Sequence, residues 1–488
     1  MMYRNSANNQ KGAALIFVMI GLALLTLVGI AMTFQASTDY NISNNFITAQ
    51  QALAIADGGI NAGKAYLKGK DFSDVLARTS DVPAYTSEAQ PIEGTLAARN
   101  PITRLTARTA KFDSYSTVQS PTALPVLGGA TQVLSGSKWV VKGIIGQPGG
   151  TPLGDGLFFA KLTDNNDEVG VQNYSVDIDH KVFLRSIGVH RVFQSDKASA
   201  AGKTQASVAV IEALFKRDMS FNIKSPFALE GENAGATFSG DSFTIDGRNY
   251  NGLTPEQARS GGGNPSWVGA VPGIGTMYDG ANGLADESIK GSLSGNQNDN
   301  VKGVDPNGIP ASPAVSDTTD SVKSGGDSAH VLDPNWVGNF VNLVKGIADY
   351  KYPGGTNLSG SGAVLGTDED PKITYVDGDL SISGSGGGSG VLIVKGNLDY
   401  QGSFDYTGVI IVLGGNLDMG GANKSIVGGL FLANLQSSGN NFSWGVPDFT
   451  IHGNSNFYYR SDSIKLGWSL LPLKVLSWRE VPPELDKN

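Results

Sequence analysis

Cysteine is absent from this chain of 488 residues. Without thiols, the protein has no disulfide scaffold, no Cys-ligated zinc or iron–sulfur site and no cysteine nucleophile. Histidine is scarce, with four residues, which leaves little material for His-based catalysis. Positive charge is in deficit, because 36 Lys and Arg face 45 Asp and Glu for a net charge of −9. Nucleic-acid binding requires a basic surface, so nucleic acid is not an expected partner.

Glycine, in contrast, is abundant, with 65 of the 488 residues. Such enrichment without a collagen period predicts many turns and short strands. The chain length suggests about three units of ~150 residues each. The sequence contains no G-x-S-x-G, H-E-x-x-H or Walker A motif. We therefore expect a protein that is not an enzyme.

An apolar run lies near the amino terminus. Residues 12–38 carry no charged side chain and include the sequence AALIFVMIGLALLTLVGIAM. About 20 apolar residues in a helix span a bilayer, so this run is long enough. Arg4 and Lys11 precede it, and Asp39 is the first acid. The positive-inside rule therefore predicts a single-pass protein with a short cytoplasmic amino terminus and the remaining residues outside the cytoplasm.

Three interpretations of this run compete. A cleaved secretory signal has a shorter apolar core and an A-x-A-like site, and this run fits neither. An uncleaved membrane anchor is the second interpretation. The third depends on Lys11-Gly12, which stands directly before the run with no polar spacer. A short hydrophilic leader ending in Gly resembles the class III signal of type IV prepilins, which implies cleavage by a prepilin peptidase between Gly12 and Ala13 and methylation of Ala13.

Helical periodicity continues beyond the apolar run. Apolar residues recur mostly at steps of three or four as far as Leu67. The pattern predicts one helix from Ala13 to near Leu67, about 80 Å long. Gly58, Gly59 and Gly63 are expected to weaken or bend it.

The stretch ALAIADGGI at residues 52–60 resembles the region that follows the span in PilX-type minor pilins, with Asp57 where that family usually has Glu. Together with the leader, the resemblance covers residues 1–69. Major pilins carry Glu at the fifth position after cleavage, whereas this sequence has Phe17 there. The resemblance therefore implies a minor subunit rather than the bulk fibre subunit. Its membrane or fibre helix includes Ala13, Phe17, Leu25 and Ile30.

Residues 110–225 contain strand signals. The segments KWVVKGII, GLFFAKL, KVFLRSIGVHRVF and QASVAVIEALFKRD are rich in β-branched and aromatic residues and are separated by turn residues. They predict a β-rich module that follows a polar linker at residues 70–109. The stretch at residues 158–188 resembles the strand, Asp-rich loop and strand of PilX-domain proteins, which implies a pilin-like module.

The loop inside that stretch is rich in carboxylates and carboxamides. These are ligands that Ca²⁺ prefers, although the spacing is not that of an EF-hand because Val169 stands where Gly is required. A solvated turn is the competing interpretation. No other cofactor is expected. The candidate Ca²⁺ ligands are Asp164, Asn166, Asp167, Glu168, Asp177 and Asp179.

A repeat of about 18–20 residues occupies the carboxy-terminal part. Asp or Asn recurs at positions 379, 397, 416, 434 and 454. The period is too short for a propeller blade or a helical hairpin and predicts a parallel β-solenoid. Stacked coils would align the leucines in one ladder and the Asp and Asn side chains in another, where they bond to the next coil. The ladder residues are Leu380, Leu398, Leu417 and Leu435, and Asp379, Asn397, Asn416 and Asn434.

Neighbouring segments complete the predicted solenoid. Its start is placed at residues 226–250, and its coils and carboxy-terminal strands at residues 353–488, with the last strands over one end. Residues 251–330 lack apolar periodicity and are predicted to form a surface insertion rich in Gly, Ser, Asn and Asp. Residues 331–352 are predicted to form a helix that caps the solenoid and begins at Asp333-Pro334.

These features predict a mainly β protein with a long amino-terminal transmembrane helix, a pilin-like β module and a short parallel β-solenoid with a helix cap. Residues 1–12 are the leader and residues 13–69 the helix. The resemblance implies a minor pilin-like subunit of a type IV pilus that resides in the inner membrane and is then built into, or caps, a surface fibre and supports assembly and adhesion. Implied partners are other pilins and minor pilins, the prepilin peptidase, the inner-membrane assembly platform and surface glycans.

Other function classes remain open. One is a pseudopilin of type II secretion, and another is a membrane-anchored β-helix adhesin that keeps residues 1–12. The third is a glycan-active enzyme. Asp399 and Asp418 occupy equivalent coil positions, so they would lie about 4.8 Å apart, which is compatible with a catalytic carboxylate pair. Two solvent-exposed ladder acids are the competing interpretation.

Overall fold

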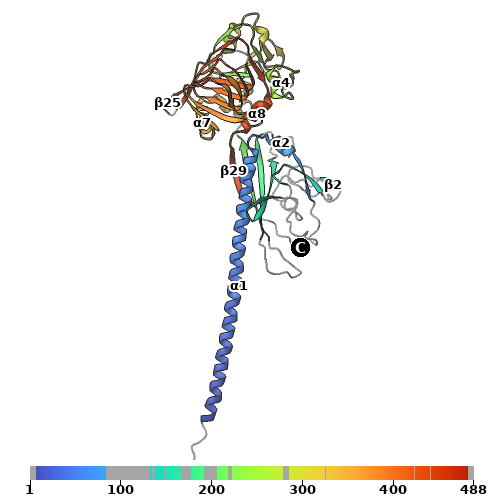
Figure 1. The fold of residues 1–488 in the computed structure, drawn as a ribbon, viewed down its shortest axis with the longest axis vertical. Coiled ribbons are helices and arrows are strands. Elements are labelled where there is room, and N and C mark those ends of the chain that lie inside the picture. The colour runs from blue at the N-terminus through green and yellow to red at the C-terminus, as the bar shows by residue number, and fades with distance from the viewer. Residues whose placement is uncertain are drawn as a thin grey trace, which may run out of the picture.

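The computed structural model describes residues 7–83, 132–134, 138–147, 150–165, 177, 179–191, 206–217, 223–278, 285–324, 326–421, 424–439 and 441–481. Three parts follow one another along its length: a long helix, an antiparallel sheet against one half of that helix, and a larger β domain beyond the sheet (Figure 1). The predicted class, mainly β with a long amino-terminal helix, is confirmed.

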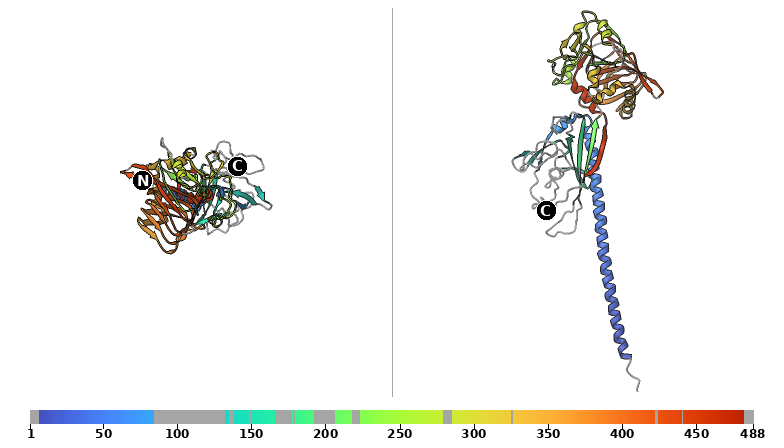
Figure 2. Two further views of the ribbon diagram at one scale, coloured as in Figure 1. Left: turned by 90° about the horizontal axis from the view of Figure 1, so that it is seen from above. Right: turned by 180° about the vertical axis from the view of Figure 1, so that it is seen from behind.

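Helix α1 runs without interruption from Ala7 to Leu67. It therefore begins six residues before the predicted start at Ala13 and includes the end of the predicted leader. Its amino-terminal half projects away from the rest of the molecule (Figure 1 and the right view of Figure 2). Within this half, an 18-residue window has a mean hydropathy of 2.8 and no buried residue, so the helix is long and apolar enough to cross a membrane.

The carboxy-terminal half of α1 packs on the sheet. The helix continues through Gly58, Gly59 and Gly63, where weakening was predicted. A Cβ atom on Gly59 would lie 2.1 Å from the Oγ of Ser186, and one on Gly63 would lie 2.5 Å from the Cδ2 of Leu184. These glycines thus permit close packing between helix and sheet, which offsets their poor helix propensity.

An antiparallel sheet of order β29-β8-β7-β6-β4 covers this half of the helix. The sequence predicted four strand segments within residues 138–217, and the structure contains strands in all four. The apolar residues between helix and sheet include Ala56, Ile60, Leu162, Leu184 and Phe215. The strands are β4 (Ile144–Ile145), β6 (Gly156–Asp164), β7 (Lys181–Arg191), β8 (Ala206–Arg217) and β29 (Leu473–Val481). Short elements beside the sheet are α2 (Phe72–Ala77), β1 (Thr79–Pro83), β2 (Gln132–Leu134), β3 (Lys138–Lys142) and β5 (Thr151–Leu153).

The carboxy-terminal strand corrects the prediction for the tail. We expected the last strands to lie over one end of the solenoid. Instead, β29 pairs with β8 in antiparallel fashion, with Trp478 opposite Ala213. The distal β domain is therefore inserted between two adjacent strands of the antiparallel sheet, β8 and β29, and both of its ends are anchored there.

Two parallel sheets form the distal domain. One has the order β10-β27-β24-β22-β20-β17, and the other contains β13-β11-β28-β25-β23-β21-β19-β16. Strands of the two sheets alternate along the chain, so equivalent positions of successive repeats stack. The strands of residues 350–459 are β16 (Tyr350–Pro353), β17 (Thr356–Leu358), β18 (Ser361–Leu365), β19 (Lys372–Asp377), β20 (Leu380–Ile382), β21 (Ser385–Val394), β22 (Leu398–Tyr400), β23 (Ser403–Val412), β24 (Asn416–Met419), β25 (Lys424–Ser438), β26 (Asn441–Gly445), β27 (Asp448–His452) and β28 (Ser455–Tyr459).

The leucine ladder holds for three of its four predicted members, which are Leu380, Leu398 and Leu417. The next rung is Phe449, which is the register partner of Leu417. The prediction for Leu435 was wrong, because this residue lies opposite Trp444 in an antiparallel hairpin of β25 and β26. The hairpin is inserted before the coil closes, so the 18-residue spacing in the sequence no longer matches the stacking.

The ladder of Asp and Asn side chains also holds for its first members and fails at Asn434. The backbone N–H of Asn397 donates to Oδ1 of Asp379 over 2.7 Å, and the N–H of Asn416 donates to Oδ1 of Asn397 over 3.1 Å. Each side chain thus bonds to the next coil, as predicted. Asn434 is not the following rung, because Asp448 pairs with Asn416.

The predicted first coil stacks on the last one. Strand β10 (Gly235–Ser239) pairs with β27, and β11 (Thr244–Asp246) pairs with β28. Strand β9 (Phe227–Glu230) pairs with β25. Residues 226–250 therefore lie at the far end of the stack rather than before the coil at residues 350–358.

Residues 251–330 were predicted to be a surface insertion, and this prediction was wrong. Strand β13 (Val301–Val304) extends the stack beyond β11, and β12 (Ile274–Met277) pairs with both β9 and β15 (Val315–Asp317). The strands of this segment are only two to four residues long, too short to produce a clear apolar periodicity. Buried residues include Ile274, Ile289, Val301, Val315 and Val322. The remaining elements are α4 (Pro255–Arg259), α5 (Ala285–Ser292), η3 (Asn298–Asn300), β14 (Pro310–Ala311), α6 (Thr319–Lys323) and η4 (Gly326–Leu332).

The predicted helix is α7 (Pro334–Ile347), and Asp333 is its N-cap, accepting from the N–H of Asn335 over 2.9 Å. Its position differs from the prediction. Its apolar face packs against β19 and β26. Beside it, α8 (Ser461–Ser469) packs on outward-facing residues of β21 and β23 such as Val391 and Val409. The helix therefore covers a face of the stack rather than its end, because that face also carries apolar side chains.

Candidate functional site

The free half of α1 is the first candidate site. The predicted helix residues Phe17, Leu25 and Ile30 are 73%, 73% and 56% exposed. Burial begins near Thr48. The predicted processing residues Gly12 and Ala13 lie within the helix. An apolar surface of this extent needs lipid or other apolar helices around it.

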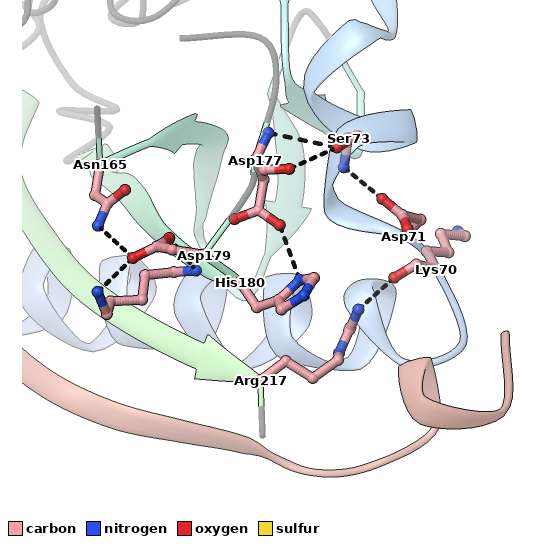
Figure 3. Close-up of polar contacts among 9 residues, drawn as sticks. Lys70, Asp71, Ser73, Asn165, Asp177, Asp179, His180 and Arg217 are labelled. Atoms are coloured by element: carbon pink, nitrogen blue, oxygen red, sulfur yellow. Dashed lines mark hydrogen bonds and ion pairs between the residues drawn. The ribbon is translucent and has the colours of Figure 1, made fainter. Parts of the chain in front are cut away.

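The other end of α1 is held by Arg217 at the end of β8. Its guanidinium donates to the carbonyl of Lys70 over 2.7 Å (Figure 3). It also donates to the carbonyl of Leu67 over 2.7 Å and lies 4.1 Å from the ring centre of Phe72. Burial lowers the pKa of Arg217 to about 10, so it remains charged at neutral pH. The residue satisfies carbonyls at the helix terminus and places a cation at the negative end of the helix dipole.

Three predicted Ca²⁺ ligands meet beside this junction. One carboxylate oxygen from each of Asp164, Asp177 and Asp179 lies within 4.8 Å of the other two. Asp164 ends β6 and Asp179 precedes β7. Asn165, which follows Asp164, lies beside Asp179 in Figure 3, so both ends of the loop converge here. The other predicted ligands, Asn166, Asp167 and Glu168, lie outside the described residues.

Asp179 and Asp177 have different surroundings. Burial opposes ionisation of Asp179, but hydrogen bonds from Lys181 and Asn165 outweigh it and lower the pKa of the carboxyl group. Burial raises the pKa of Asp177, and its ion pair with Nδ1 of His180 at 3.3 Å offsets only part of the shift. The side chain of Asp177 is 2% exposed. The cluster thus contains one deeply buried carboxylate and one stabilised by donors.

Two buried oxygens at this cluster have no hydrogen-bond partner within the described part of the protein. They are Oδ1 of Asn165 and Oδ1 of Asp177. The Nδ2 of Asn165 donates to Asp179 over 3.4 Å, which holds the amide at the cluster (Figure 3). Buried polar atoms normally have partners, so the site offers unused acceptors.

The proposed carboxylate pair lies on an outer strand face. Asp399 and Asp418 are register partners, as the repeat predicted. Gln401 donates to Asp399 over 2.8 Å, and Nε2 of His452 lies 3.6 Å from Oδ1 of Asp418. Asp418 and His452 are both 44% exposed. The surroundings are those of ladder acids in contact with solvent.

A groove with a volume of about 1010 Å³ crosses several coils on another face. The guanidinium of Arg259 lies 2.5 Å from Asp368 and 2.6 Å from Oγ1 of Thr407. Asp405 accepts from the N–H of Ser425 over 2.8 Å, and burial raises the pKa of its carboxyl group. The charged lining residues are Glu256, Arg259, Asp368, Glu369 and Asp405.

Sequence patterns did not reveal this groove. Its charged residues come from α4, from the connection between β18 and β19, and from β23. Only the stacking of coils brings them together. Its four acids against one Arg make it an acidic surface.

Residues 11–61 match the protein family described as PilX N-terminal. No curated protein matches the chain. Among solved structures, the crystal structure of the competence-associated pilin ComZ from Thermus thermophilus is similar at 13% sequence identity, covering 89% of this chain and 97% of that chain, with a TM-score of 0.20.

Proposed function

We propose that this chain, whose residues 11–61 match the PilX N-terminal family, is a PilX-type minor pilin that is held in the inner membrane as a single-pass precursor and is then built into the fibre. The free apolar half of α1 is the observation that carries this proposal. Its uncharged run at residues 12–38 is about 40 Å long, which exceeds the ~30 Å of a hydrocarbon core. The same surface can pack against the helices of other pilins once it leaves the lipid.

A capping position is the finer part of the proposal. The distal domain lies at the opposite end of the molecule from the free half of α1 (Figure 2). The resemblance also supports it, because Phe17 stands where major pilins carry a charged Glu. Without that carboxylate, the subunit has no partner for a neighbour's terminal amine in an apolar core, where an unpaired charge is costly. The subunit is therefore best placed where it starts or ends a fibre.

Adhesion through the distal domain completes the proposal. The groove lined by Arg259, Asp368 and Asp405 is concave, polar and acidic. Acidic side chains repel sulfated or carboxylated ligands and favour neutral or amine-bearing ones. The ligand class we propose is a neutral or amino-sugar-containing surface glycan.

Processing tests the assembly proposal. The chain is produced with and without a prepilin peptidase, together with the assembly platform, and the mass of its amino terminus is measured. We expect loss of residues 1–12 and methylation of Ala13 only with the peptidase. Gly12→Leu should block cleavage and fibre incorporation, whereas Gly29→Leu, at a helix glycine with nothing within 4 Å of an added Cβ, should not. An intact leader in the presence of peptidase, or normal incorporation of Gly12→Leu, would contradict the proposal.

The same free helix fits a pseudopilin of type II secretion. Two measurements separate the two proposals. A pilus subunit should be recovered in fibres sheared from the cell surface, and deleting its gene should leave protein secretion intact. A pseudopilin should be required for secretion. A membrane-anchored adhesin would keep its leader. A glycan-active enzyme would release reducing ends, and Asp399→Ala would abolish that release.

A further inference from the structure

We propose that Asp164, Asp177 and Asp179, together with the side-chain oxygen of Asn165, form a Ca²⁺-binding site. The site lies in the antiparallel-sheet module, where the two ends of the β6–β7 connection meet (Figure 3). It is independent of fibre assembly and of the groove in the distal domain.

The geometry suits one ion. Oxygens from three carboxylates lie within 4.8 Å of one another. Ca²⁺ binds oxygen at about 2.3–2.6 Å, so ligands on opposite sides of one ion are separated by up to about 5 Å. The three oxygens can therefore contact a common ion without movement of the backbone.

Burial supplies the second observation. Asn165 is 5% exposed, and its Oδ1 has no hydrogen-bond partner among the described residues. The Asp177 side chain is 2% exposed, and its Oδ1 also has none there. In Figure 3, this oxygen lies on the side of the Asp177 carboxylate that faces Asp179, while the other oxygen faces His180. A bound cation would satisfy both acceptors, which a solvated turn would expose to water.

The donor set favours calcium. All four groups offer hard oxygen, and Ca²⁺ accepts irregular arrangements of six to eight such ligands, including water. Mg²⁺ requires a tighter octahedron, and Zn²⁺ prefers nitrogen and sulfur. The nearby basic side chains are Lys181, His180 and Arg217. The Lys181 side chain is 30% exposed, so its ammonium group can turn toward solvent when an ion binds beside Asp179.

The site has a structural consequence. Ser73 of α2 donates to the carbonyl of Asp177 over 3.3 Å and accepts from its N–H over 3.4 Å. The charge of Asp177 also favours the charged form of Arg217, which donates a hydrogen bond to the carbonyl of Leu67 at the end of α1. An ion bound to Asp177 would therefore stabilise the junction of α1, α2 and the sheet as one unit.

The test uses the full chain purified in detergent and stripped with chelator, with CaCl₂ alone as the probe. Calorimetry should show one site with a dissociation constant in the range of about 10⁻⁴–10⁻³ M, typical of extracellular calcium modules. Thermal unfolding should move upward by several degrees at ~10 mM Ca²⁺, a concentration well above that range, and return with chelator. Asp177→Asn and Asp179→Asn should each weaken binding at least tenfold. The matched variants Asp399→Asn and Asp418→Asn, at exposed ladder acids, should bind as the wild type does.

A gain-of-function variant keeps the test decisive if the buried variants fail to fold. Asn165→Asp adds a fourth carboxylate and should tighten Ca²⁺ binding by several fold. Absence of binding at this Ca²⁺ concentration would overturn the proposal. So would binding that Asp177→Asn, Asp179→Asn and Asn165→Asp all leave unchanged, or a response to Zn²⁺ alone.

Discussion

Gly188 of β7 lies directly against the backbone of Ala56 in α1. A Cβ atom on Gly188 would lie 2.3 Å from the amide nitrogen of Ala56 and 2.1 Å from the carbonyl oxygen of Ala52. Real Cβ atoms do not approach backbone atoms this closely. Helix and sheet therefore meet here without an intervening side chain, and this contact sets how closely the two pack.

Substitution at Gly188 should weaken that packing. Gly188→Val forces α1 away from the sheet, and we expect a loss of at least ~1–3 kcal/mol in the free energy of unfolding. Denaturant unfolding of the full chain in detergent measures the change. Gly346→Ala, at a helical glycine with open space around it, should be neutral or slightly stabilising. Equal effects of the two variants would contradict the packing argument.

Arg217 should be required at the end of α1. Arg217→Leu removes two hydrogen bonds, one to the carbonyl of Leu67 at the helix end and one to that of Lys70 just beyond it. The expected loss is about 2–3 kcal/mol, because each of the two bonds has a charged donor. Arg217→Lys should recover only part of this, since an ammonium lacks the planar fork. The exposed Lys351→Ala serves as the control, and denaturant unfolding is again the measurement. Full recovery of stability in Arg217→Lys would indicate that the positive charge alone, without the planar guanidinium, stabilises the end of α1.

Asp377 should contribute stability that depends on pH. Hydrogen bonds from Lys345, Lys395 and Tyr375 lower the pKa of its carboxyl group to about 2. Because the folded-state pKa lies below the unfolded value of ~3.9, the stabilisation is complete above about pH 4 and is lost as the pH falls through about 2. The group is largely exposed, so the effect is small, below ~1 kcal/mol.

Melting temperatures of the wild type and of Asp377→Asn, measured from about pH 2 to about pH 7, test this. The variant should melt lower near neutral pH, and the two curves should converge at the acidic end. Introducing Lys345→Ala into both proteins should reduce the difference between them, because it removes one donor to the carboxylate. A difference between wild type and variant that does not change with pH would refute the assignment.

The Asn397 side chain should stabilise the stacked coils. Asn397→Ala leaves the N–H of Asn416 without its acceptor, so a loss of about 1 kcal/mol is expected. Asn397→Asp retains the acceptor oxygen, as Asp379 does in the preceding coil, and should cost less. Thermal unfolding compares the two. Equal losses would show that the oxygen does not act as a ladder acceptor.

Several features could be predicted from local sequence. The uncharged run after Lys11-Gly12 specifies a helix that cannot be exposed to water, because apolar side chains repeat along it without interruption. The cap at Asp333 follows from one side chain bonding to a nearby N–H. The ladder from Leu380 to Leu417 follows from a regular repeat, since equal spacing puts equal residues in register. The convergence of Asp164, Asp177 and Asp179 follows from one loop that returns to the adjacent strand.

Other features depended on contacts between distant segments. The tail strand pairs with β8 across the whole inserted domain, and the coil at residues 235–246 joins the last coil rather than the first. The residues of the groove, such as Glu256 and Asp405, meet only through the stack. The amino-acid sequence by itself determined the apolar helix, the strands and the repeat, because these depend on side chains close along the chain. Only the tertiary structure decided which strands pair, since the backbone hydrogen bonds that join them are alike for every short strand and carry no local signature of their partner.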